Sequence, residues 1–162
     1  MRIEEKIGRL LRDRKLTLSI AESCTGGLTS NLITNVNGSS NYFERGYVVY
    51  SNRSKIELLD VPEDTIKKHG AVSSHTAIAM AEGVKRKSGT NIGLSVTGIA
   101  GPSGGTIKKP VGLVYIAVAG DKKIEYKEYR FRGKRHEIKL ESANAALKCL
   151  IEYLYRVSKD KG

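Results

Sequence analysis

The chain has 162 residues, a length that suits one folded domain with a single core. Its formal net charge is +11, and 40% of its residues are hydrophobic, which is typical of ordinary globular proteins. No run approaches the roughly 18 apolar residues of a membrane span, and residues 1–15 lack the apolar core of a signal peptide. We therefore expect a single domain over residues 1–162, in the cytoplasm and with no membrane partner.

Cysteine and histidine give no sign of disulfide or metal chemistry. Cys24 and Cys149 offer at most one pairing in a chain of this size, so we expect two reduced thiols. The three histidines lack the spacing of metal ligands and are expected at the surface or at helix ends: His69, His75 and His136. We predict no metal and no cofactor.

The positive charge favours anionic partners, from nucleotides to nucleic acids. The basic residues are scattered, however, with short clusters at 85–87, 108–109 and 131–139 that also contain acidic or uncharged neighbours. No known nucleic-acid-binding motif accompanies them. We interpret the charge as a solvated basic surface and do not expect a nucleic-acid partner.

The spacing of apolar residues predicts the first half of the fold. In chain order we expect a helix (3–11), a strand with one buried face (16–21), a helix with the stripe Leu28, Leu32 and Ile33 after two glycines, a loop (35–43), a strand (45–51), a helix capped at Ser51 or Asn52 (53–59) and a short helix between Pro62 and Gly70.

The second half begins with one more helix and then turns to strands. The expected elements are a helix (73–89), a strand (91–98), a central strand covered on both faces (111–120), a more polar, edge-like strand joined to it in a hairpin (124–131) and a long final helix (137–157). This order predicts an α/β fold, a three-layer α/β/α domain with a mixed sheet.

A serine lies at the predicted turn from strand to helix in "SIAESCTGGLTSNL", residues 19–32. Glycines leave room for close approach, and a helix start offers N–H groups to a developing oxyanion, so Ser23 is a candidate nucleophile. Ser23 or Thr25 is equally suited to capping the helix. Cys24 is intrinsically more nucleophilic, but no motif supplies the histidine that cysteine catalysis usually needs. These residues alone leave the choice open.

Lys55 is a candidate general base in "YVVYSNRSKIEL", residues 47–58. A lysine acts as a base near pH 7 only if its surroundings lower its pKa. Lys55 is expected in the first turn of a helix, where the helix dipole disfavours an ammonium. A solvated lysine among many is the more common situation, and the residues themselves do not decide between the two.

A glycine-rich loop follows a predicted strand in "SVTGIAGPSGGTIKKPVG", residues 95–112. Its backbone N–H groups and nearby lysines favour phosphate binding, although the segment is neither a P-loop nor a dinucleotide-binding fingerprint. A purely structural hairpin loop is the alternative. Loops of this length in small domains tend to be functional.

Several blocks in this order resemble the CinA C-terminal domain family. They cover nearly the whole chain and are "AESCTGG" (21–27), "GSSNYFERGYVVYSNRSK" (38–55), "HGAVS" (69–73), "VTGIAGPSGG" (96–105) and "KPVGLVYIA" (109–117). The resemblance implies a fold of the anticodon-binding-domain-like type. It also implies a PncC-type amidohydrolase that converts nicotinamide mononucleotide (NMN) to nicotinic acid mononucleotide and ammonia, in pyridine-nucleotide salvage.

The resemblance assigns roles to individual residues. Ser23 and Lys55 match the metal-free Ser/Lys pair of the family, and Tyr50 is expected to orient the lysine or relay a proton. The remaining expected site residues are the backbone N–H groups of Cys24, Thr25 and Gly26 as oxyanion donors, Glu22 for ribose binding or for ordering the turn, and Thr97, Gly98, Ala100, Gly101 and Arg135 around the substrate.

The chain departs from the family pattern before its last helix. Where the family often has "GDRxxVR", this sequence has "GKRHEIK" (133–139), so that Arg135 is kept while Lys134 and Lys139 replace an acid and an arginine. The chain is similar to the stand-alone form, without the N-terminal domain of full-length CinA proteins. We expect a homo-oligomer. The alternative function is a non-catalytic nucleotide-binding or DNA-associated competence module, and a Cys24 amidase is a weaker one.

Overall fold

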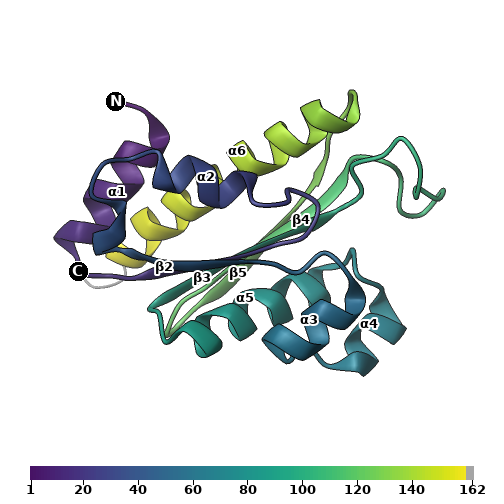
Figure 1. Ribbon diagram of the computed structural model, residues 1–162, viewed down its shortest axis with the longest axis horizontal. Helices are drawn as coiled ribbons and strands as arrows, with labels where there is room; N and C mark the ends of the chain where they lie inside the picture. The colour runs from purple at the N-terminus through teal and green to yellow at the C-terminus, as the bar shows by residue number, and fades with distance from the viewer. Residues whose placement is uncertain (160–162) are drawn as a thin grey trace.

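Alternating apolar residues build a five-stranded sheet between two layers of helices in the computed structural model, which describes residues 1–159 (Figure 1). In chain order the elements are α1 (Ile3–Asp13), β1 (Leu18–Glu22), α2 (Leu28–Thr34), the 3-10 helix η1 (Ser39–Asn41), β2 (Phe43–Val48), α3 (Asn52–Leu59), α4 (Glu63–His69), α5 (Ser74–Ser88), β3 (Ile92–Gly98), β4 (Leu113–Ala119), β5 (Ile124–Arg130) and α6 (Arg135–Lys159).

The sheet is mixed and has the strand order β2-β1-β3-β4-β5. The first three strands in this order are parallel, and β3, β4 and β5 pair antiparallel. Strand β5 lies at an edge and β4 is almost wholly buried, as the sequence predicted. The expectation of a mixed-sheet α/β/α fold is therefore confirmed.

The two faces of the sheet carry different helices. Figure 1 shows α1, α2 and α6 on one face and α3, α4 and α5 on the other. The larger apolar cluster lies beneath α1 and α6 and includes Leu11, Ile116 and Leu147, all fully buried. A second cluster, around Leu59 and Met80, joins α3 and α5 to the sheet. Within residues 1–159, no helix is long and apolar enough to cross a membrane.

The expectation for the first strand was wrong in one respect. Only the face with Leu16, Leu18 and Ile20 was predicted to be buried, but all five residues of β1 are buried, Ser19 on the other face included. Strand β1 lies between β2 and β3 in a sheet that has helices on both faces, so neither of its faces reaches water. The Ser19 hydroxyl is satisfied by the carbonyl of Val84 and the hydroxyl of Thr90.

The second strand also begins and ends earlier than predicted. It covers Phe43–Val48 instead of 45–51, because Phe43 already pairs with Leu18 of β1. Residues 49–51 consequently form the connection to α3. This connection brings the carbonyl groups of Val49 and Tyr50 to the end of the sheet.

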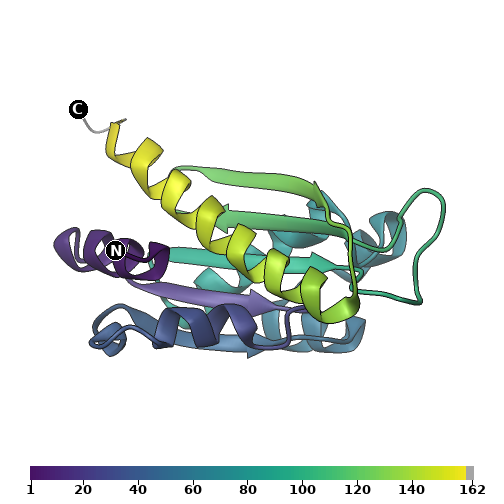
Figure 2. The same ribbon diagram turned by 90° about the horizontal axis from the view of Figure 1, so that it is seen from above.

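The chain changes from one face of the sheet to the other around β1. The connection from β1 to β2 passes through α2 on one face, whereas the connection from β2 to β3 passes through α5 on the other. In open α/β sheets, binding sites form outside the carboxyl ends of the strands at such a reversal. Figure 2 shows the β3–β4 loop projecting beyond this same end of the sheet. Ser23 is the first residue after β1.

Candidate active site

Ser23 is held at the end of β1 by the sheet and by the turn that follows. Its N–H donates to the carbonyl of Val96 on β3 (2.9 Å), and only 7% of the residue is exposed. The next four residues form the turn into α2, in which Gly26 and Gly27 have φ angles of +60° and +107°. Residues other than glycine rarely adopt this left-handed backbone region, which explains the glycine pair in the motif.

Lys55 approaches Ser23 from α3, which lies on the face of the sheet opposite to α2 (Figure 1). It lies in the first turn of α3, which Ser51 caps by accepting a hydrogen bond from the N–H of Ser54 (3.0 Å). Lys55 is 1% exposed, and its Nζ lies 3.1 Å from Ser23 Oγ. The same nitrogen donates to the carbonyl oxygens of Val49 (3.0 Å) and Tyr50 (3.1 Å). The structure thus brings together the two residues that were expected to form a pair.

Burial makes the ammonium group of Lys55 lose its proton more easily than that of an ordinary lysine. Removal from water disfavours the ammonium and lowers the pKa of Lys55 from 10.5 to about 8. A neutral amine has two N–H groups and one lone pair. In the structure Nζ also donates to Ser23 Oγ, whose hydroxyl donates to the carbonyl of Tyr50 (3.4 Å). When Nζ loses one proton and keeps its bonds to the two carbonyls, its lone pair faces Ser23 Oγ. The surroundings of Lys55 therefore suit a general base.

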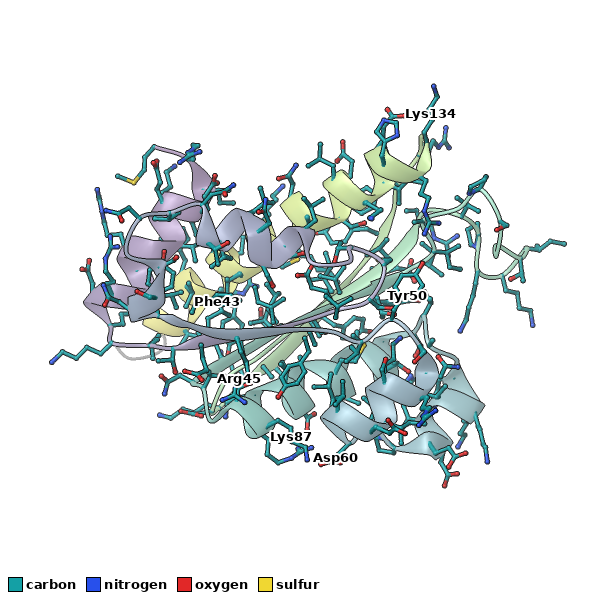
Figure 3. The ribbon with its side chains drawn as sticks, viewed as in Figure 1. Phe43, Arg45, Tyr50, Asp60, Lys87 and Lys134 are labelled. Carbon is teal, nitrogen blue, oxygen red and sulfur yellow. The ribbon has the colours of Figure 1, made fainter. Side chains whose placement is uncertain are left out.

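Tyr50 contributes through its backbone and not through its ring. Its carbonyl holds Lys55, whereas its side chain is 59% exposed and its hydroxyl accepts a hydrogen bond from Arg135 (3.0 Å). Figure 3 shows Tyr50 beyond the end of β2, and Lys134 marks the start of α6. Of the two roles expected for Tyr50, orienting the lysine fits this arrangement.

The turn after Ser23 offers oriented N–H groups. The N–H of Gly26 donates to the carbonyl of Ser23 (3.2 Å) and is therefore occupied, although it was among the expected donors. The N–H groups of Cys24 and Thr25 have no backbone acceptor within residues 1–159. The same is true of Gly27, which was not among the expected donors. The N–H of Cys24 interacts with its own thiol, whereas that of Thr25 has no partner among the described residues. N–H groups beside a nucleophile are suited to stabilising an oxyanion.

Glu22 orders this turn instead of facing a ligand. Its carboxylate accepts hydrogen bonds from the Thr25 hydroxyl (2.6 Å) and from the N–H groups of Thr29 (2.8 Å) and Ser30 (3.0 Å). Because none of Glu22 is exposed, no carboxylate oxygen is available to a ribose. The second of its two expected roles is the one that fits.

Cys24 is poorly suited to be the nucleophile. Its side chain is buried, and removal from water raises the pKa of its thiol from 9.0 to about 12. A thiol reacts as the thiolate, which is scarce at neutral pH under these conditions. No histidine is among the groups that influence Cys24.

The residues expected to surround the substrate lie around the end of β3. Thr97 is buried, and its hydroxyl donates to the carbonyl of Ala71 (2.8 Å). Gly98 leaves no space for a side chain, since an added Cβ would lie 2.6 Å from Val114. Ala100 and Gly101 are buried, and the carbonyl of Gly101 accepts a hydrogen bond from Arg135 (2.7 Å). The Thr97 hydroxyl is thus occupied by a backbone carbonyl, and Gly98 offers no side chain, so only their backbones are available for contacts.

Two cations of α6 lie at the end of the sheet that carries Ser23. Arg135 links Gly101 to Tyr50 across the end of the sheet. Lys139, at a position where the family pattern has arginine, also points to the turn: a Cβ added to Gly26 would lie 3.7 Å from its Nζ. The one-turn spacing of the two residues on α6 accounts for their common direction. This end of the molecule is therefore suited to an anionic ligand.

Two cavities lie away from Ser23 and Lys55. A cavity of about 400 Å³ lies between β5 and α6, and another of about 450 Å³ lies beside Arg14 and Tyr153. Neither is lined by Ser23 or Lys55. Among the described residues, no group of three or more His, Cys, Asp or Glu side chains is placed to hold a metal ion. The candidate site thus rests on its chemical groups and not on cavity size.

Solved structures with this architecture share its sequence to different degrees. The competence/damage inducible protein CihA from Agrobacterium tumefaciens is 42% identical with a TM-score of 0.87, over 93% of this chain and 94% of that one. A competence-damaged protein (CinA) superfamily protein from Klebsiella pneumoniae is 29% identical with a TM-score of 0.91, over 96% and 99% of the two chains.

Sequence relatives are longer than this chain. CinA-like proteins from Syntrophus aciditrophicus and Thermotoga maritima are each 50% identical to it, over 160 and 153 residues. These matches cover 98% and 94% of this chain but only 38% and 37% of the relatives, so the chain spans well under half of their length. The model of the CinA C-terminal domain matches residues 1–154, and the chain therefore belongs to that family, as its motifs indicated.

Proposed function

We propose that this domain is an amidohydrolase that uses Ser23 as its nucleophile and Lys55 as its general base, and that its substrate is NMN. The observation that carries the proposal is the buried 3.1 Å contact between Lys55 Nζ and Ser23 Oγ. A hydroxyl becomes an effective nucleophile when an adjacent base removes its proton. The lowered pKa of Lys55, about 8, supplies such a base near neutral pH.

The first half of the reaction transfers the acyl group to the enzyme. Neutral Lys55 accepts the proton of Ser23 while Oγ bonds to the carboxamide carbon, and the N–H groups of Cys24 and Thr25 stabilise the oxyanion. The carbon–nitrogen bond then breaks. The Lys55 ammonium gives its proton to the departing nitrogen, so that ammonia leaves, Ser23 carries the acyl group as an ester and Lys55 is neutral again.

The second half releases the acid. Lys55 removes a proton from water, and the resulting hydroxide attacks the ester carbon. When the bond to Ser23 breaks, Lys55 returns the proton to Oγ, which regenerates both groups. The product is a carboxylic acid, which ionises at neutral pH.

The choice of NMN rests on the family resemblance and on charge. NMN carries a phosphate; Lys139 lies beside the Ser23 turn, and Arg135 contacts Gly101 and Tyr50 at the same end of the sheet. Arginine binds phosphate through two parallel hydrogen bonds, whereas lysine acts as a point charge. We place the phosphate near these residues and the carboxamide against the turn, with the reaction taking place in the cytoplasm.

The test is ammonia release from NMN by the purified protein. We expect turnover by the wild type and none above background by Ser23→Ala. Two control variants should keep wild-type turnover within about twofold: Cys24→Ala, which removes the inert thiol, and Lys67→Arg, which changes an exposed lysine on α4. A non-catalytic nucleotide-binding module would release no ammonia, and a cysteine amidase would lose activity in Cys24→Ala instead.

A further inference from the structure

Glu22 is a fully buried carboxylate beside the proposed nucleophile, and the proposed reaction does not use it. Burying a charged group is costly unless hydrogen bonds or an opposite charge compensate. Within residues 1–159 no basic side chain pairs with Glu22, and the compensation comes from one hydroxyl and two backbone N–H groups. Three donors converge on two oxygens, so the carboxylate acts only as an acceptor.

The donors show which part of the molecule Glu22 holds. Thr29 and Ser30 belong to the first turn of α2, whose N–H groups lack partners within the helix. A side chain at the N-cap would normally accept from them, but the N-cap here is Gly27, which has none. Glu22 takes over this task from the end of β1. Its third donor, Thr25, lies within the turn itself.

The backbone of Glu22 extends the same arrangement to the base. Its carbonyl accepts a hydrogen bond from the N–H of Val49 (2.8 Å), and the carbonyl of Val49 in turn accepts from Lys55 Nζ (3.0 Å). Ser23 follows Glu22 directly in the chain. One residue is therefore linked to the nucleophile, to the base and to the turn that carries the N–H groups.

We propose that Glu22 is a positioning residue that fixes the turn of residues 23–27, so that Ser23 and the N–H groups of Cys24 and Thr25 face the reacting carbon together. The inference rests on the proposed function and goes beyond it, because Glu22 touches no substrate. The Thr25 hydroxyl takes part in this positioning, because its hydrogen bond to Glu22 sets the direction of the Thr25 backbone.

Both oxygens of the carboxylate are needed for this task. In Glu22→Gln one oxygen becomes an NH2 group, which cannot accept from the N–H groups of α2, so at least one bond is lost. Removing the Thr25 hydroxyl breaks the link from the other side while leaving Glu22 in place. Thr25→Val removes it with little change of shape, and Thr25→Ser keeps it.

The experiment measures the reactivity of Ser23 with and without NMN. A fluorophosphonate probe that phosphonylates an activated serine is followed by intact mass, with Ser23→Ala as the blank, and ammonia release from NMN gives kcat and KM. We expect Glu22→Gln and Thr25→Val to slow labelling and lower kcat by up to about 100-fold with KM within about threefold, and Thr25→Ser to restore both. Glu4→Gln changes another buried carboxylate, on α1, and should leave both rates unchanged.

The outcomes separate this inference from the proposed function. Wild-type labelling rates in Glu22→Gln and Thr25→Val, with only a lower melting temperature, would show that Glu22 stabilises the fold and nothing more. A wild-type protein that is labelled but releases no ammonia from NMN would overturn the substrate, while the labelling rates of the variants would still decide the role of Glu22. A wild-type Ser23 that resists the probe would overturn the nucleophile and this inference with it.

Discussion

The two ends of the buried interior differ in what they contain. Beneath α1 and α6 the core is apolar, with Leu11, Ile116 and Leu147 fully buried among other aliphatic side chains. Where β1 and β3 end, five fully or nearly fully buried residues are polar or charged: Glu22, Ser23, Thr25, Lys55 and Thr97. Each of these makes at least one hydrogen bond.

This difference separates stability from chemistry. Apolar burial provides most of the favourable free energy of folding, whereas buried polar groups at best recover the cost of leaving water. A fold has little reason to bury an unpaired lysine beside a serine for stability alone. We therefore expect substitutions at the polar end to change activity, and those at the apolar end to change the free energy of unfolding.

The largest effect is expected at Lys55. Lys55→Arg should lower kcat/KM about 1,000-fold or more, because arginine stays protonated and general-base catalysis contributes about 100- to 10,000-fold. Lys55→Met should be equally inactive. Because burial disfavours the ammonium, its free energy of unfolding at pH 7 should not fall by more than about 1 kcal/mol. Ammonia release and urea unfolding measure the two quantities.

Lys67→Met provides the matched control for Lys55. Lys67 is an exposed lysine on α4 that pairs with Glu63 one turn earlier. Removing this surface pair should change the free energy of unfolding by less than about 1 kcal/mol and leave kcat/KM unchanged. If Lys55→Met unfolded the protein while Lys67→Met did not, Lys55 would be a structural residue, and the contrast between the two ends would fail.

Leu147→Ala should produce the opposite result. This side chain is fully buried in the cluster beneath α6. Its truncation should lower the free energy of unfolding by about 2–5 kcal/mol, because it removes apolar contacts and leaves a cavity. At 25 °C, kcat and KM per folded molecule should stay within about twofold of wild type. A large loss of kcat in the folded variant would show that the apolar core also controls the site.

The motif residues were predictable from sequence, but their partners were not. Ser23 and Lys55 could be named from the blocks around them, and their contact depends on two strands lying side by side, as the parallel pairing of β1 and β2 provides. The carbonyls of Val49 and Tyr50 carry no signal in the side-chain pattern, because any residue has a carbonyl group. The early end of β2 is what presents them to Lys55.

The wrong prediction of a solvent-facing side for β1 also arose because the sequence pattern does not show the partners of polar groups. Alternation of polar and apolar residues normally indicates one face in water. In β1 the polar positions are Ser19 and Glu22, and both are buried with hydrogen-bond partners that come from α5, the segment after it, and α2. The sequence therefore left two roles open for Glu22, and its three hydrogen-bond donors favour ordering the turn. Sequence alone does not distinguish a buried polar group that is satisfied from one that faces a substrate.

The pH dependence gives the smallest effect. The base must be neutral to act, and a pKa of about 8 leaves about a tenth of Lys55 neutral at pH 7 and about nine-tenths at pH 9. We therefore expect kcat/KM for NMN to rise about tenfold from pH 7 to pH 9 and then to level off. The second ionisation of the substrate phosphate has its midpoint near pH 6 and is about nine-tenths complete at pH 7, so it adds little to the rise in this range.

Cys24→Ala shows which group produces this rise. The pKa of the Cys24 thiol is raised to about 12, so a thiolate mechanism would still be gaining activity at pH 10, where a neutral lysine has already levelled off. The variant should keep the wild-type profile, with the same midpoint near pH 8. A profile that kept rising to pH 10, and that vanished in Cys24→Ala, would assign the reaction to the thiol. The shape of the curve thus distinguishes two adjacent buried groups whose pKa values burial has moved in opposite directions, because one is charged when protonated and the other when deprotonated.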